Sequence, residues 1–153
     1  MFLGTFFHGL DAKGRLIIPS DLRDSVSEEE RKRGFVLTCG VDHCIFAFTQ
    51  SGLEKVVAQV EEEFRGRYRD EPSEVRYKIR QFIRRFSSRA RLRPLDSQGR
   101  VLVPDDLLAY AGIEKEVAIV GSLDRIELWK PEKWQEISSK SEREYDDVAQ
   151  SFF

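Results

Sequence analysis

The chain has 153 residues, of which 41% are hydrophobic and 34% charged, and a formal net charge of −2. This composition is typical of one globular domain or two very small ones, and it excludes a fibrous or disordered chain. The N-terminal stretch lacks the basic region and small-residue cleavage site of a signal peptide. No apolar run approaches the ~18 residues that span a bilayer, so we expect a cytoplasmic protein with no membrane partner.

Charge is unevenly distributed along the chain. Residues 65–93 carry 11 basic and 3 acidic side chains, whereas residues 105–153 carry 6 basic and 12 acidic ones. The small net charge therefore conceals a basic middle between two acidic flanks.

The first clear motif is "DAKGRLIIP" at residues 11–19, and a similar stretch, "DSQGRVLVP", follows at residues 96–104. An offset of 85 aligns four pairs, namely Asp11 with Asp96, Gly14 with Gly99, Arg15 with Arg100, and Pro19 with Pro104. Beyond each proline come a helical turn and two β-rich runs, now at an offset of 81, because the first copy holds four extra residues near "SEEERKRG". We therefore predict an internal duplication, with four short strands and one helical turn in each copy.

Strands this short cannot bury their apolar faces alone, so we expect the two copies to clasp each other into a small β-barrel with pseudo-two-fold symmetry. The predicted organisation is a first repeat at 5–52, a helical arm at 53–87, a second repeat at 88–131 and a C-terminal helix at 132–153. In the arm, Ser51 and Glu54 have the spacing of a capping box for a first helix. "RGRYRDEP" ends that helix, and a second one, rich in arginine, begins at about Ser73.

The Asp-x-x-Gly-Arg element has a structural and a functional interpretation. Asp11 and Asp96 can accept hydrogen bonds from backbone amides of the turn, and Gly14 and Gly99 can supply the positive φ that the turn requires. The arginine after each glycine lies near a hairpin tip, and a β-ribbon can enter the major groove, where arginine binds guanine or phosphate. The alternative is that each arginine only pairs with the aspartate of its own turn.

Several longer segments carry a resemblance to a known family: "MFLGTFFHGLDAKGRLIIP", "LDSQGRVLVP", "CGVDHCIFAF", "VGSLDRIELWKPEKW" and "RRFSSRA". The chain resembles the MraZ family of tandem SpoVT/AbrB-type repeats over almost its whole length. The resemblance implies a mainly β fold with helices (α+β), in which the duplicated chain forms a swapped-hairpin AbrB-like β-barrel. It also implies a ring-like homo-oligomer, associated with the nucleoid, that binds repeated boxes of double-stranded DNA in the promoter of the bacterial division and cell-wall gene cluster.

The family's Asp-x-x-x-Arg signature maps onto Asp11 with Arg15 and onto Asp96 with Arg100. We expect Arg15 and Arg100 to contact DNA, with Lys13 and Gln98 beside them, while Asp11, Gly14, Asp96 and Gly99 hold the turns. Family members usually have a small-residue "SGA" before the second repeat, and this chain has "SRA" at residues 88–90.

Other classes of function find less support in the sequence. His8 and His43 are the only histidines, and no nucleophile motif, phosphate loop or metal-ligand spacing is present, so we expect no enzyme, cofactor or metal. Cys39 and Cys44 are expected to be two buried free thiols. The alternative is an oligomeric protein-binding scaffold of the AbrB/antitoxin type, and RNA binding is a weaker third option. The basic helix at 73–87 could be a solvated face, a phosphate contact or a bridge to the acidic C-terminal helix of a neighbouring subunit.

Overall fold

A computed structural model describes residues 1–65 and 67–153, and its strands form two antiparallel sheets. The strands are β1 (Thr5–Gly9), β2 (Arg15–Ile17), β3 (Phe35–Cys39), β4 (Ile45–Thr49), β5 (Arg91–Arg93), β6 (Arg100–Leu102), β7 (Glu116–Gly121) and β8 (Ile126–Trp129). Six strands form one sheet in the order β1-β7-β8-β4-β3-β5, and β2 pairs with β6 in the other. The prediction of four strands per repeat is confirmed.

The two repeats exchange strands. The opening strand of the first repeat, β1, pairs with β7 of the second, and the opening strand of the second, β5, pairs with β3 of the first. At the centre of the large sheet, β4 pairs with β8, with Ile45 opposite Leu128. The strand order is therefore symmetric about the β4–β8 pair, as two intertwined copies of one unit require.

Two expectations about the strands are wrong. The strands on either side of each Asp-x-x-Gly-Arg turn do not pair with each other, because β1 pairs with β7 while β2 pairs with β6. Within the described residues, the strand ladders form two separate sheets and no closed barrel. The exchange explains both differences, because each turn carries the chain from the edge of the large sheet into the small one. The α+β class itself is confirmed.

The helices are α1 (Ser20–Arg23), α2 (Glu28–Arg33), a 3-10 turn η1 (Val41–His43), α3 (Gln50–Arg67), α4 (Ser73–Arg89), α5 (Asp105–Ala111) and α6 (Pro131–Ala149). The short helices α1 and α5 each begin directly after the proline of the repeated motif, as predicted. The helix α2 lies in the "SEEERKRG" segment, where Ser27 accepts a hydrogen bond from the Glu30 N–H. This six-residue helix, which the second repeat lacks, lies in the segment where the first repeat holds its four extra residues.

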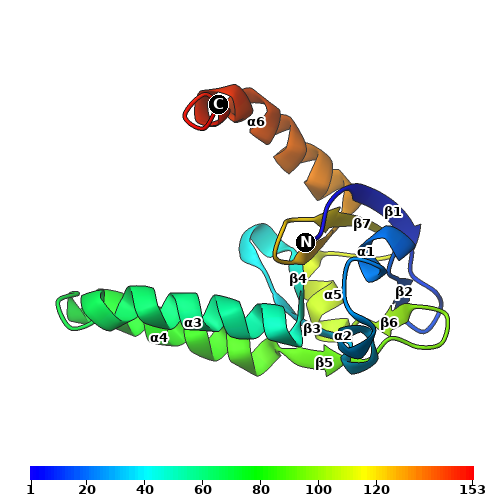
Figure 1. Cartoon of the computed structure of the whole chain (residues 1–153), viewed down its shortest axis with the longest axis horizontal. Helices are drawn as coiled ribbons and strands as arrows, with labels where there is room; N and C mark the ends of the chain where they lie inside the picture. The colour runs from blue at the N-terminus through cyan, green and yellow to red at the C-terminus, as the bar shows by residue number, and fades with distance from the viewer.

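Helices α3 and α4 form a hairpin that projects from the sheet as an arm (Figure 1). The capping box predicted for Ser51 is wrong, because α3 is capped by Thr49, whose Oγ1 accepts from the Gly52 N–H at 3.0 Å. The Ser51 hydroxyl donates instead to the Glu30 carboxylate. At the root of the arm, Thr38 Oγ1 donates to the Phe86 carbonyl at 2.6 Å, which ties α4 to β3.

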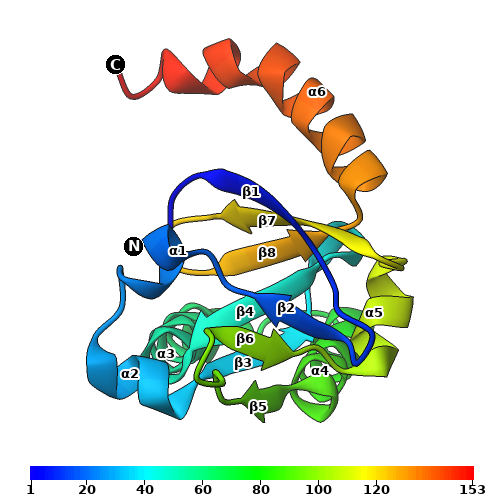
Figure 2. The ribbon, with the colours of Figure 1, turned by 90° about the vertical axis from the view of Figure 1, so that its right-hand side faces the viewer.

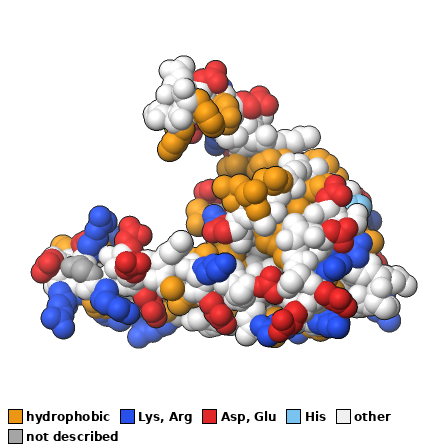
Figure 3. Space-filling view, viewed as in Figure 1, with side chains coloured by type: hydrophobic (Ala, Val, Ile, Leu, Met, Phe, Trp, Pro, Cys, Tyr) orange, Lys and Arg blue, Asp and Glu red, His pale blue; other side chains and the backbone are white. Residues whose placement is uncertain are grey.

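The C-terminal helix α6 contacts the body only near its start. Trp134 packs on Trp129 with ring centroids 5.9 Å apart, and the rest of the helix extends away from the sheet (Figures 1 and 2). Hydrophobic side chains are visible near its free end, and basic ones gather around the far end of the arm (Figure 3). The side chains of Tyr145, Val148 and Phe152 are exposed.

One hydrophobic core joins both repeats. It includes Leu16 and Leu37 from the first repeat with Val101, Ile119 and Leu128 from the second, all of them fully buried. No helix in the described part of the chain has the length and apolar character needed to cross a membrane.

Candidate nucleic-acid interface

The small sheet of β2 and β6, called the ribbon below, lies on the outside of the molecule (Figure 2). Leu16 lies opposite Val101, and both are 0% exposed because they face the core. Successive side chains of a strand point to opposite faces. Arg15 and Arg100 therefore lie on the outer face of the ribbon, one from each repeat, together with Ile17 and Leu102.

The first turn is held by the carboxylate of Asp11. Its Oδ1 accepts from the backbone N–H groups of Lys13 and Arg15, both at 2.9 Å. The Gly14 N–H donates to the Asp11 carbonyl at 3.0 Å, and Gly14 has a φ of 78°, which L-amino acids with a Cβ rarely adopt. Asp11 and Gly14 therefore stabilise the conformation of this turn.

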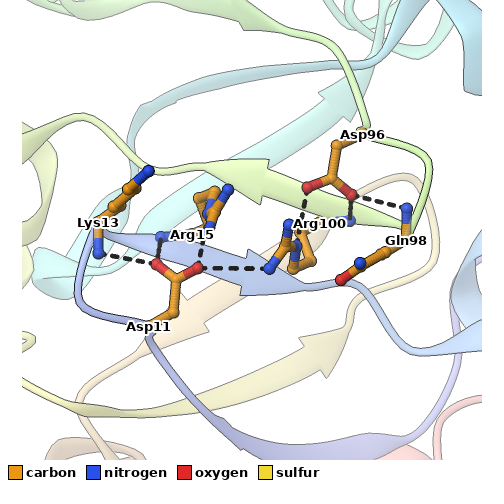
Figure 4. A network of polar contacts seen from close by, with 6 residues as sticks. All are labelled: Asp11, Lys13, Arg15, Asp96, Gln98 and Arg100. Atoms are coloured by element: carbon orange, nitrogen blue, oxygen red, sulfur yellow. Dashed lines mark hydrogen bonds and ion pairs between the residues drawn. The ribbon is translucent and has the colours of Figure 1, made fainter.

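The second turn repeats this geometry closely. Asp96 Oδ1 accepts from the N–H groups of Gln98 and Arg100 at 2.9 Å, and Gly99 has a φ of 76°. Figure 4 places Lys13 and Gln98 at opposite ends of the ribbon, with the two arginines between them. The antiparallel pairing of β2 with β6 therefore brings both turns to one surface.

Each arginine forms an ion pair with the aspartate of its own turn. Arg15 Nε donates to Asp11 Oδ2 at 2.6 Å, and Arg100 Nε donates to Asp96 Oδ2 at 2.8 Å. Arg100 Nη1 also lies 3.6 Å from Asp11 Oδ2, so the two turns are joined across the ribbon (Figure 4). These contacts fix the guanidinium planes, and the side chains of Arg15 and Arg100 still remain 33% and 24% exposed.

The turn geometry also keeps both carboxylates ionised. The hydrogen bond from the Arg15 N–H lowers the pKa of Asp11 from 3.8 to about 2, and the Arg15 side chain acts in the same direction against the opposing effect of desolvation. The pKa of Asp96 is lowered for the same reason, chiefly by the Arg100 N–H. At neutral pH each turn therefore holds a charged Asp–Arg pair whose two charges largely cancel.

Sequence reasoning missed Ile17 and Leu102, which are 37% and 45% exposed on the outer face of the ribbon. The alternation of the strand could have identified them, because an inward Leu16 places both of its neighbours outward. The departure at Arg89 has a local explanation, since its Nη1 contacts Asp106 Oδ2 at 3.0 Å and links the end of α4 to α5.

Across residues 1–65 and 67–153, no group of three or more histidine, cysteine or acidic side chains is arranged to hold a metal ion. Both cysteines are free thiols, as predicted, but the prediction that both are buried is wrong for Cys39, which lies at the end of the β3 strand. Cys44 is buried, and burial raises the pKa of its thiol, while Cys39 is half-buried.

The fold defines a class of small α+β proteins, in which two tandem repeats exchange strands and present paired arginine turns on one ribbon. The sequence matches the family described as "MraZ protein, putative antitoxin-like" over residues 1–69 and 87–152. The chain therefore belongs to the MraZ family.

Curated relatives support this assignment over nearly the full length. A protein of Finegoldia magna is 40% identical over 149 residues, which cover 97% of this chain and 94% of the relative. Proteins of Lactiplantibacillus plantarum and Lactobacillus helveticus are 38% and 37% identical over 151 residues, covering 99% of this chain and 97% and 96% of the respective relatives. Each of the three is named "Transcriptional regulator MraZ".

Proposed function

We propose that this chain is a transcriptional regulator that binds double-stranded DNA in a sequence-specific manner through the ribbon. Its targets are repeated boxes in the promoter of the bacterial division and cell-wall gene cluster, and it binds them as a homo-oligomer. The observation that carries this proposal is the placement of Arg15 and Arg100, one from each repeat, on the exposed face of a single two-stranded ribbon.

The dimensions and chemistry of the ribbon suit the major groove. A two-stranded ribbon fits in that groove, and arginine can donate two hydrogen bonds to the O6 and N7 of guanine. Because Nε of each arginine is held by an aspartate, the Nη groups are oriented before DNA binds. Ile17 and Leu102 stand beside the arginines and offer apolar contacts for thymine methyl groups.

Affinity depends on several subunits acting together. The two Asp–Arg pairs contribute little net charge, so one ribbon has a weak long-range attraction for phosphate. An oligomer that meets regularly spaced boxes gains up to ~10² to 10⁴ in affinity through effective concentration. Insertion of half a helical turn between two boxes is therefore expected to weaken binding strongly, and unchanged affinity would contradict the multivalent arrangement.

A mobility shift with the DNA upstream of the protein's own gene tests the proposal, with scrambled DNA as competitor across a series of salt concentrations. The wild-type protein is expected to prefer the upstream DNA. Arg15→Ala and Arg100→Ala are each expected to abolish that preference while the fold and the oligomeric state, followed by circular dichroism and gel filtration, persist. Lys140→Ala on α6, which also removes one exposed cation, is the matched control and is expected to retain the preference.

The scaffold alternative is favoured by one feature, the exposed apolar side chains at the free end of α6. A protein of that type would use the end of α6 to hold a protein partner. It would bind upstream and scrambled DNA equally at every salt concentration, and that result would refute the sequence-specific proposal.

A further inference from the structure

The two turns of the ribbon differ in the cation that accompanies each Asp–Arg pair. The first turn contains Lys13, whose side chain forms no ion pair within the described residues. At the equivalent position the second turn has the neutral Gln98. If the turn residues alone contacted DNA, the second half of the ribbon would have one cation fewer than the first.

Arg23 of α1 lies against the second turn and fills this gap. Its Nε donates to the Ile18 carbonyl at 2.7 Å, while the Ile18 N–H donates to the Gly99 carbonyl at 2.9 Å. A Cβ built on Gly99 would lie 2.6 Å from Nη1 and 2.7 Å from Cζ of Arg23. The guanidinium therefore packs directly on the backbone of the second turn, and only glycine permits this approach.

The charge of Arg23 is uncompensated in the described part of the chain. No carboxylate there lies within 4.0 Å of its guanidinium, and the nearby Asp96 pairs with Arg100. An open groove beside the second turn is lined by three cations, Arg23, Arg31 and Lys32. The last two have carboxylate partners, since Arg31 lies 3.3 Å from Asp24 and Lys32 lies 3.4 Å from Glu28. Arg23 is thus the cation of this groove that is available to an external anion.

Within residues 1–65 and 67–153, the first turn has no equivalent of Arg23. At an offset of 85 the counterpart of Arg23 is Leu108 of α5, which cannot donate a hydrogen bond or carry charge. A Cβ built on Gly14 would meet nothing closer than the Val103 carbonyl at 3.7 Å, although its φ of 78° matches that of Gly99. Each turn therefore has one unpaired cation, and the two cations come from different elements.

We infer that Arg23 contacts a DNA phosphate beside the second turn and is the functional counterpart of Lys13 at the first. This inference rests on the proposed DNA-binding function and adds a residue outside the repeated motif. Guanidinium Nη groups form strong hydrogen bonds with phosphate oxygens. Such a contact positions the protein on the duplex without distinguishing bases.

The dependence of DNA affinity on salt concentration tests this role, because each phosphate contact contributes about 0.9 to the slope of log K against log salt concentration. Arg23→Leu, which installs the residue of the other repeat, is expected to reduce the slope by about 0.9 per bound ribbon. The corresponding loss of affinity is roughly fivefold at 0.15 M salt, and it should be equal for upstream and scrambled DNA. Arg100→Ala, in contrast, is expected to remove the preference between them.

Gly99→Ala and Gly14→Ala form a matched pair of variants. Both place alanine at nearly the same positive φ, and only Gly99→Ala displaces the Arg23 guanidinium. Alanine strains either turn at this φ, so we expect the salt slope to be lower by about 0.9 in Gly99→Ala than in Gly14→Ala. This comparison decides the role of Arg23 even if Arg23→Leu fails to fold.

A wild-type slope in folded Arg23→Leu, or equal slopes in the two glycine variants, would overturn the inference and leave Arg23 as a structural donor to Ile18. A wild-type protein that does not distinguish upstream from scrambled DNA would instead refute the proposed function. The two failures are therefore separable in one set of titrations.

Discussion

Leu16→Ala and Ile17→Ala replace neighbouring residues of β2 that face opposite sides of the ribbon. Leu16 is 0% exposed in the shared core, and replacing a fully buried leucine by alanine costs about 2–5 kcal/mol of the free energy of unfolding. Ile17 is 37% exposed on the outer face, so its replacement should cost no more than about 1 kcal/mol. In a chain of this length each kcal/mol lowers Tm by about 2–4 °C, so Leu16→Ala should lower Tm by roughly 4–20 °C.

Thermal unfolding followed by circular dichroism measures both effects, and DNA affinity is measured below the transition. Ile17→Ala is expected to keep a nearly wild-type Tm and to weaken DNA binding, because its side chain lies beside Arg15 and Arg100. A shift of the pairing by one residue would exchange the two faces of the strand. Equal destabilisation by the two variants would therefore refute the assigned register of β2 with β6.

Three further predictions concern groups at the turns, the arm and the β3–β4 connection. The pKa of Asp11 is lowered to about 2 in the folded chain, so its contribution to the free energy of unfolding should be complete above pH 3.8 and be lost as the pH falls towards 2. Urea unfolding at several pH values measures this dependence, and Asp11→Asn should flatten it. Thr49→Ala removes the N-cap of α3 and should cost about 0.5–2 kcal/mol, measured by urea unfolding with an unchanged m-value. With a thiol reagent, the half-buried Cys39 should react in the native protein, and the buried Cys44 should react only after unfolding. Rapid reaction of two thiols in the native protein would contradict the packing of Cys44.

Features that depend on local chemistry could be predicted from the sequence. The Asp-x-x-Gly-Arg turns follow from an aspartate that accepts nearby N–H groups and a glycine that adopts a positive φ, and both interactions lie within five residues. The duplication, the number of strands and the helical turns after Pro19 and Pro104 follow from the repeated pattern. The cap of α3 differs from the predicted Ser51 because β4 ends at Thr49, which places the Thr49 hydroxyl at the first free N–H groups of the helix.

The resemblance implied a swapped arrangement, but the tertiary structure decided which strands pair. The opening strands could have paired within their own repeats, and the exchange of β1 and β5 depends on long-range burial that no local pattern encodes. The same exchange places the two turns on one ribbon and brings Arg23 of the first repeat against Gly99 of the second. The sequence by itself determined the turns and the residues that form them, because those interactions are local. The two turns share one surface, and Arg23 contacts the second turn, only because the two repeats share one core. Neither repeat could bury its short strands alone.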